Sequence, residues 1–136
     1  MALADNGAAL DAVYPAQAPR VADIRHDVAT IATGFGAGEL ALVQINLAVS
    51  EAATNAILHA YRDGMKAGDV RVLVTHEDDF LDVSICDRGV GMSPRRDSPG
   101  MGLGLSLMAH ESHSCEIRTS PAGGTEVVLR FALAAH

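Results

Sequence analysis

The sequence has little positive charge, few aromatic residues and no tryptophan. Ten Lys and Arg residues stand against seventeen Asp and Glu residues, which gives a formal net charge of −7. An acidic chain without a basic cluster is a poor nucleic-acid binder, because neutralisation of phosphates supplies most of the non-specific affinity. Three Phe and two Tyr are also too few to form a row of base-stacking platforms. Nucleic acid is therefore not an expected partner.

Long apolar runs and cysteine pairs are missing as well. No run approaches the ~20 residues of a membrane span, and the first residues lack the pattern of a secretory signal. Cys86 and Cys115 form no CxxC pair and suit a reducing compartment. With 136 residues, 49% of them hydrophobic, the chain needs no disulfide or metal to hold a core. We expect a cytoplasmic domain over residues 9–134 after a flexible segment at 1–8, with no membrane partner.

Hydrophobic periodicity predicts helices and strands that come in blocks. Apolar residues recur at helical spacing from Val21 to Ile31, and a second helix is expected from Gly38 to about Tyr61. Five strands are expected, at 10–14, 70–75, 80–87, 115–119 and 125–132. The other expected elements are turns at 76–79 and 120–124 and a helix at 103–111. Strand pairs joined by tight turns favour an α+β sandwich with a mixed, mostly antiparallel sheet.

One face of the predicted second helix carries an unusual set of polar residues. Glu51, Asn55 and His59 are spaced i, i+4, i+8 and therefore stack along one face, with Ser50 and Thr54 beside them. A solvated face usually mixes cations with acids, whereas this one has no Lys or Arg, and Asn is unfavourable inside a helix. A carboxylate one turn from an amide oxygen suits Mg²⁺, which takes oxygen ligands and keeps water and phosphate in its shell. Periodicity alone leaves both interpretations open.

The strand that ends at Asp87 runs into a glycine-rich segment, Asp87-Arg-Gly-Val-Gly91. Asp87 has the parity of the apolar positions of the strand, so it is expected on the buried face, where an unpaired charge is costly. There it would accept a hydrogen bond from a ligand amine, and Gly89 and Gly91 would let the backbone approach that ligand. The alternative is that the chain has already turned and Asp87 only begins the loop.

Two further segments contain glycines before a regular element. Glycines at 100, 102 and 104 lead into the predicted helix at 103–111, and a helix N-terminus with free N–H groups favours phosphate. This spacing is neither a P-loop nor the dinucleotide-binding fingerprint, so alone it is a weak signal. Gly124-Thr125 opens the last strand and, taken alone, is ordinary hairpin chemistry.

Together and in this order, these segments resemble the GHKL, or Bergerat-fold, ATPase/kinase superfamily, and most of all the anti-sigma-factor serine kinases of bacterial partner-switching systems. Residues 47–61 resemble the N box, 87–91 the first glycine box, 100–104 the second, and Gly124-Thr125 the last motif. The resemblance covers about residues 10–133. It implies a sheet with helices on one face and an ATP- and Mg²⁺-dependent protein serine/threonine kinase. The partners it implies are a STAS-domain antagonist as substrate, a sigma factor, and a second copy of this chain.

The resemblance also implies a role for each matching position. Glu51 would be the general base that deprotonates the attacking hydroxyl, and Asn55 would hold Mg²⁺. Asp87 would accept from the adenine amino group, with Thr125 near the same base edge. A mobile lid is expected at 92–101. The remaining nucleotide-contacting positions would be the glycines of the two boxes and two lid arginines, which are also ordinary as solvated residues: Gly89, Gly91, Gly100, Gly102, Gly104, Arg95 and Arg96.

Two other functions stay open at this stage. One is a binding module that sequesters its partner and binds nucleotide without useful phosphotransfer. The other is a switch kinase that phosphorylates a scaffold protein and never contacts a sigma factor. The presence of Glu51 favours an enzyme, because loss of the base is the simplest mark of an inactive kinase.

Overall fold

The computed structural model describes residues 7–60, 68–87, 107–119 and 124–133, with a side-chain description for all but 59, 60 and 119. Its elements are β1 (Leu10–Pro15), α1 (Arg20–Gly34), α2 (Glu39–Ala60), β2 (Asp69–Glu77), β3 (Phe80–Asp87), β4 (Ser114–Thr119) and β5 (Thr125–Ala132). Residues 107–111 are also helical. The helices and strands expected from the sequence are confirmed where they fall in these ranges, with ends that differ by a few residues.

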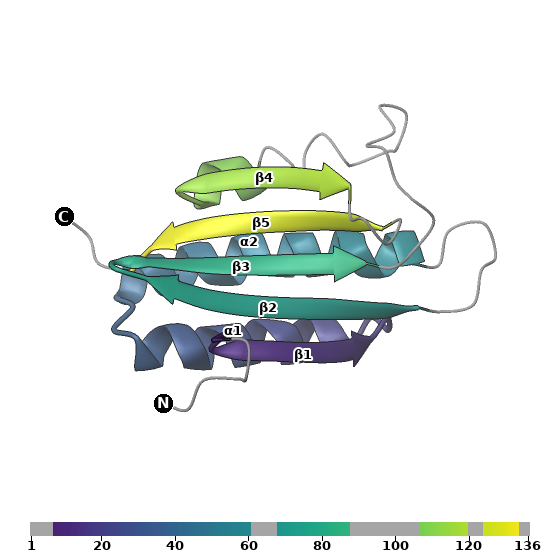
Figure 1. Ribbon diagram of the computed structural model, residues 1–136, viewed down its shortest axis with the longest axis horizontal. Helices are drawn as coiled ribbons and strands as arrows, with labels where there is room; N and C mark the ends of the chain where they lie inside the picture. The colour runs from purple at the N-terminus through teal and green to yellow at the C-terminus, as the bar shows by residue number, and fades with distance from the viewer. Residues whose placement is uncertain (1–6, 61–67, 88–106, 120–123, 134–136) are drawn as a thin grey trace.

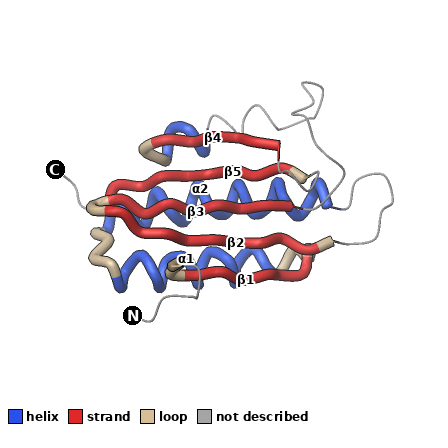
Figure 2. Tube along the Cα trace, viewed as in Figure 1, coloured by secondary structure: helices blue, strands red, loops and turns tan. Residues whose placement is uncertain are grey.

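The strands form one sheet in the order β1-β2-β3-β5-β4. All four pairings between these strands are antiparallel. Both long helices lie on the same side of the sheet, α1 behind β1 and β2 and α2 behind β3 and β5 (Figure 1, Figure 2). The predicted α+β, two-layer sandwich is confirmed, and no parallel pair occurs among the described strands.

The core fills the space between the sheet and the two helices. Alternating β-branched residues of β2 and β3 point inward, because side chains of a strand alternate between its faces. Helix α2 meets them with an alanine-rich face, and small side chains let the helix lie close to the sheet. The fully buried residues include Val70, Val72, Val74, Leu81, Val83 and Ile85 from the strands and Ile45, Ala48, Val49, Ala52 and Ala53 from α2.

Helix α2 is long and apolar enough to be compared with a membrane-spanning helix. Over Glu39–Leu58 its length and hydropathy are those of a helix that could cross a membrane, and 44% of that window is buried inside the protein. Such values are also typical of the central helix of a soluble domain. In this fold α2 packs against α1, β2, β3 and β5.

The β2–β3 hairpin is tighter than the sequence indicated. The turn was expected at 76–79, but β2 continues to Glu77, and His76 and Glu77 pair with Leu81 and Phe80. Only two residues make the turn, and Asp78 adopts a left-handed conformation with φ of 53°. Asp tolerates this conformation better than most residues, so the ladder can run to the very end of the hairpin.

A partly buried hydrogen bond ties the edge strand β1 to helix α1. The Tyr14 hydroxyl donates to Asp27 Oδ2 at 2.7 Å, and the Tyr14 side chain is only 9% exposed. Burial, reinforced by the Asp27 carboxylate that accepts this bond, raises the pKa of Tyr14 above its ordinary value of 10. The phenol therefore keeps its proton in the folded state at a pH where the unfolded chain loses it.

We expect Tyr14→Phe to lower the free energy of unfolding by about 1.5–3 kcal/mol at neutral pH, because a hydrogen bond to a charged acceptor is lost. The raised pKa makes this contribution complete below about pH 10 and progressively weaker above it. Urea denaturation of both proteins between about pH 7 and pH 11 measures the difference. A difference that stays constant above about pH 10 would contradict the role assigned to this bond.

Candidate functional site

Three of the predicted site residues belong to elements that meet at one end of the sandwich. Strand β3 ends there at Asp87, β5 begins there at Thr125, and the C-terminal part of α2, which carries Asn55, lies behind them (Figure 1). Asp87 and Thr125 lie one position beyond the Cys86–Glu126 pair in the antiparallel ladder, so they are neighbours across β3 and β5. Strands β3 and β5, which are distant in sequence, thus bring the start of the first glycine box next to the last motif.

Asp87 lies on the inner face of the sheet and is 3% exposed. The register with Val70 shows that the strand still continues at this position, so the alternative that the chain has already turned is wrong. Thr125, 7% exposed, lies on the same face. A carboxylate and a hydroxyl at the rim of an apolar core offer hydrogen-bond acceptors to a flat, polar-edged group such as a nucleotide base.

Asn55 is partly buried on α2, and its amide nitrogen is shielded from solvent. This nitrogen has no hydrogen-bond partner in the described part of the chain. A buried donor without a partner costs about 1–3 kcal/mol and is rare in folded proteins. The amide nitrogen of Asn55 can donate to a ligand oxygen atom, such as that of a phosphate. Its amide oxygen can bind the metal ion that accompanies the phosphate.

Glu51 lies one helical turn before Asn55 and lines a cavity of about 430 Å³. The residues around this cavity come from α1, α2 and the helical turn at 107–111: Arg25, Asn46, Leu47, Ser50, Glu51, Thr54 and Leu107. The Thr54 hydroxyl donates to the Ser50 carbonyl oxygen at 2.7 Å and is therefore satisfied within the helix. Glu51 is the acidic residue among those that line the cavity.

Sequence reasoning missed Arg25 as a member of this cavity. The polar face of α2 has no cation of its own, but α1 places Arg25 beside it, and Arg25 Nη1 donates to Ser50 Oγ at 3.4 Å. Arg20, Arg71, Arg118 and Arg130 each pair with a carboxylate. Arg25 pairs with none within the described segments, so its charge is available to an anion that enters the cavity. No periodicity in α1 marks Arg25, because only helix packing places it there.

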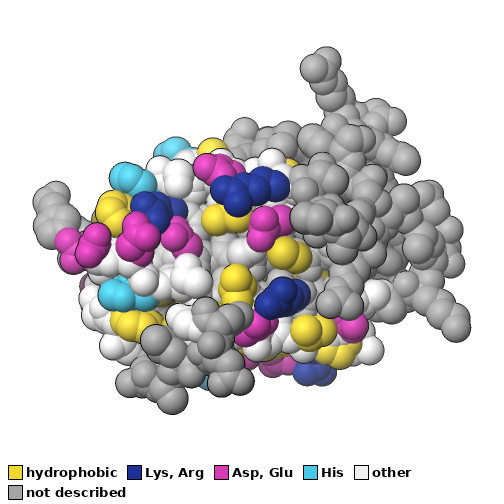
Figure 3. Space-filling model, viewed as in Figure 1, with side chains coloured by type: hydrophobic (Ala, Val, Ile, Leu, Met, Phe, Trp, Pro, Cys, Tyr) yellow, Lys and Arg dark blue, Asp and Glu magenta, His cyan; other side chains and the backbone are white. Residues whose placement is uncertain are grey.

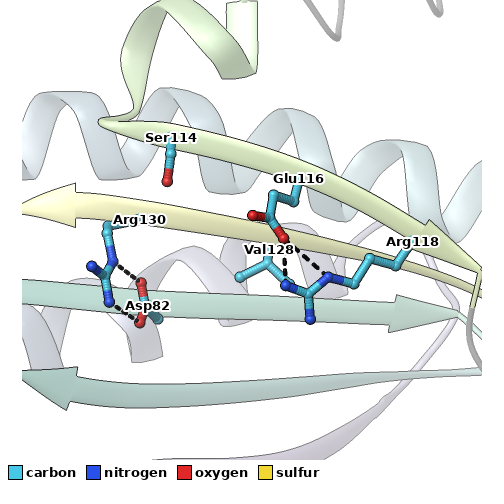
Figure 4. Close-up of a pocket in the computed structure, with 6 residues that line it drawn as sticks. All are labelled: Asp82, Ser114, Glu116, Arg118, Val128 and Arg130. Atoms are coloured by element: carbon cyan, nitrogen blue, oxygen red, sulfur yellow. Dashed lines mark hydrogen bonds and ion pairs between the residues drawn. The ribbon is translucent and has the colours of Figure 1, made fainter.

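A second hollow, of about 230 Å³, lies on the outer face of the sheet, where side chains of both charges alternate with apolar ones (Figure 3). Its two arginines are already paired (Figure 4). Arg130 contacts Asp82 through two hydrogen bonds of 2.8 and 3.0 Å, and Arg118 donates to Glu116. Because each guanidinium is already occupied, this hollow is a weaker candidate for an anionic ligand than the cavity at Glu51.

The two cysteines are not candidates for a nucleophile. Cys86 lies on the outer face with Ser84 and Glu126, because side chains alternate along the strand and Asp87 takes the inner face. Burial raises the pKa of the Cys86 thiol, and burial does the same for Cys115. Both thiols are protonated at neutral pH, and a protonated thiol is a poor nucleophile.

Several predicted positions lie outside the described residues. They are the glycines of both boxes and the two arginines: Gly89, Gly91, Gly100, Gly102, Gly104, Arg95 and Arg96. The lid expected at 92–101 lies outside them as well. Their roles stay predictions.

A model of the histidine kinase-like ATPase domain matches residues 14–131, which run from the end of β1 into β5. The chain belongs to the histidine kinase-like ATPase family. The resemblance inferred from the N box and the glycine boxes is thereby confirmed. The curated proteins that match the chain include anti-sigma F factors and a serine-protein kinase RsbW.

Relatives of this ATPase domain include the anti-sigma F factor of Pasteuria penetrans, which is 35% identical over 63% of this chain and 65% of its own length. The serine-protein kinase RsbW of Bacillus mycoides is 29% identical over 69% of this chain and 67% of its own length. The matches therefore span about two thirds of these relatives. The solved structure of the RsbU and RsbW domains of a Mycobacterium tuberculosis protein has the same fold, with a TM-score of 0.66 and 22% identity over 93% of this chain and 33% of that one.

We expect Asp87→Asn to weaken ATP binding by about ten-fold or more while leaving the fold intact, because one charge-assisted hydrogen bond is lost. Titration with a fluorescent ATP analogue measures the affinity, and circular dichroism controls for folding. Asp82→Asn is a matched control, since Asp82 lies on the same strand but on the outer face, where it pairs with Arg130. Equal affinities for the wild type and Asp87→Asn would exclude Asp87 from the site.

Asn55→Ala is expected to remove the Mg²⁺ dependence of nucleotide binding, because Asn55 offers the amide oxygen nearest to Glu51 along the helix. Nucleotide affinity is compared with Mg²⁺ and with a chelator for both proteins. Gln44→Ala, about three helical turns earlier on the same helix and not among the residues that line the cavity, serves as the control. If Asn55→Ala keeps the full metal effect of the wild type, the metal ligand is another residue.

Proposed function

We propose that this protein is an ATP-dependent serine/threonine kinase that acts as an anti-sigma factor by phosphorylating a STAS-domain antagonist. The observation that carries the proposal is the position of Glu51, which lines an open cavity one turn from Asn55. A carboxylate with only a structural role has no need to line an open cavity. A base that must reach the hydroxyl of another protein does.

Each residue has a distinct task in this reaction. Asp87 and Thr125 bind the edge of the adenine, which fixes the nucleotide at the end of the sheet. Asn55 would hold Mg²⁺, which neutralises charge on the phosphates when bound. Glu51 orients the acceptor Ser or Thr and takes its proton as the hydroxyl oxygen bonds to the γ-phosphorus and the bond to ADP breaks.

Two observations support the proposal that the substrate is a protein. They are the names of the relatives and the residues that line the cavity. Anti-sigma F factors and an RsbW serine-protein kinase are among the matching proteins. Arg25 brings a positive charge without a described carboxylate partner to the mouth of the cavity at Glu51. Such a charge suits an anionic group on an incoming protein. We further propose that the protein acts in the cytoplasm, holds a sigma factor when the antagonist is phosphorylated, and forms a homodimer.

The two other functions make different demands on Glu51. A sequestering module needs no base, so a carboxylate that lines an open cavity would have no task in it. A switch kinase that acts on a scaffold uses the same chemistry, and only its protein partner differs. The enzyme is therefore favoured over the module by the site itself, while the identity of the acceptor depends on surfaces outside the site.

Glu51→Gln should retain ATP affinity within about two-fold and reduce phosphotransfer by about 10²–10⁴-fold. Gln keeps the shape and hydrogen-bonding capacity of Glu but accepts no proton at neutral pH. The assay combines Mg-ATP with the STAS-domain protein of the same organism and follows phosphoserine and phosphothreonine by mass spectrometry. Glu39→Gln is the matched control, because Glu39 lies in the first turn of the same helix and does not line the cavity.

Two results would contradict the proposal in different ways. Wild-type protein that binds ATP and a sigma factor but transfers no phosphate would support the sequestering module. A Glu51→Gln variant that transfers phosphate at the wild-type rate would leave the kinase standing with another residue as its base.

A further inference from the structure

Helix α2 exposes a line of apolar side chains that its packing against the sheet does not explain. Leu40, Val43, Leu47 and Leu58 are 60%, 53%, 43% and 62% exposed. On a helix with 3.6 residues per turn, these four positions fall within a narrow angle on one side. Among the described residues, the one other large hydrophobic side chain as exposed as these is Val13, on the outer face of the sheet.

Glu51 and Thr54 occupy the middle of this same line. The positions between Leu47 and Leu58 that share their direction are 51 and 54, and both of these residues line the cavity of about 430 Å³. Leu47 belongs to the line and to the cavity wall at once. Along the helix the exposed apolar residues at 40, 43 and 47 come first, the cavity with the candidate base Glu51 follows, and Leu58 comes last. We call Leu40, Val43, Leu47 and Leu58 the α2 seam.

We propose that the α2 seam is the docking surface for the protein whose hydroxyl is phosphorylated, a proposal that rests on the proposed function. Any protein that delivers a Ser or Thr to Glu51 must lie over Leu47, since this residue forms part of the cavity wall. Continuing toward the start of the helix, the same protein covers Val43 and Leu40. The partner is thus a folded protein with apolar residues beside its acceptor hydroxyl, over a length of about 27 Å from Leu40 to Leu58.

The seam is a poor match for a second copy of this chain. Four side chains are far fewer than the roughly 20–30 residues that each partner contributes to a stable interface. A copy seated on the seam would also cover Glu51. The seam therefore serves a transient partner better than a permanent one, and a homodimer would use another surface.

The seam is also a poor match for a membrane surface. Helices that lie on membranes combine an apolar face with Lys and Arg on the polar face. Helix α2 has no Lys or Arg between Glu39 and Ala60, and its charged side chains are acidic. A helix of this charge is repelled by anionic lipids.

The double variant Leu40→Gln and Val43→Gln tests the seam without entering the cavity. Gln is a better helix former than Val and similar to Leu, so the fold should be retained. Steady-state phosphotransfer to the STAS-domain protein should show a KM for that protein raised by about 10–100-fold. The kcat at saturating acceptor and the KM for ATP should not change, because neither residue lines the cavity. Val13→Gln removes an equally exposed apolar side chain on the opposite side of the molecule and should leave every constant unchanged.

Each of the other occupants predicts a different result. A double variant with the wild-type KM for the acceptor overturns the proposal. If sedimentation shows that a wild-type dimer becomes a monomer in the variant while that KM is kept, the seam is a self-association surface. If the variant loses binding to anionic phosphatidylserine vesicles that the wild type binds, again with KM kept, the seam is a lipid contact.

Failure of the kinase proposal is distinguishable from failure of the docking proposal. If the wild type binds the STAS-domain protein but transfers no phosphate, isothermal titration replaces kinetics as the measurement. Weaker binding of the double variant but not of Val13→Gln would still support docking at the seam, while the proposed kinase activity would be wrong.

Discussion

The close packing of α2 against the antiparallel sheet is the constraint on which the rest of the molecule depends. Its inner face is rich in alanine and meets the β-branched faces of β2 and β3 in a continuous core. Because alanine side chains are small, the axis of α2 lies close to the sheet. The polar residues that flank the alanine-rich face therefore lie close to the sheet as well. Asn55 is thereby held at the end of the sheet where β3 ends at Asp87 and β5 begins at Thr125.

One helix therefore contributes to the fold and to the candidate site with two faces. The inner face stabilises the fold. The polar face carries Asn55 toward the end of the core where the nucleotide is proposed to bind, and one turn earlier it carries Glu51, which lines the cavity beside α1. Since these faces belong to a single rigid helix, the proposed base and the proposed metal ligand keep a fixed relation to each other. A change in the packing of α2 would move both at once, so stability and catalysis are linked in this domain.

The most informative predictions came from residues that contradicted their local pattern. Asp87 was expected on the buried face because a carboxylate held the parity of an apolar strand, and it is buried there. Asn55 and Glu51 were singled out because their helix face lacked cations, and the structure explains that lack by placing Arg25 of α1 beside it. The length of the β2–β3 hairpin was misjudged, because His76 and Glu77 look like turn residues until the left-handed Asp78 is known to make a two-residue turn.

The sequence by itself determined the elements, the sandwich and the family, because hydrophobic periodicity and ordered motifs are local properties that each segment carries alone. Only the tertiary structure decided which side chains share a cavity. Arg25 and Ser50 are 25 residues apart, and Asp87 and Thr125 become neighbours only through the β3–β5 register. The exposure of Leu40, Val43 and Leu47 was likewise invisible in the sequence, since an apolar residue on a helix is expected to be buried until the position of every packing partner is known.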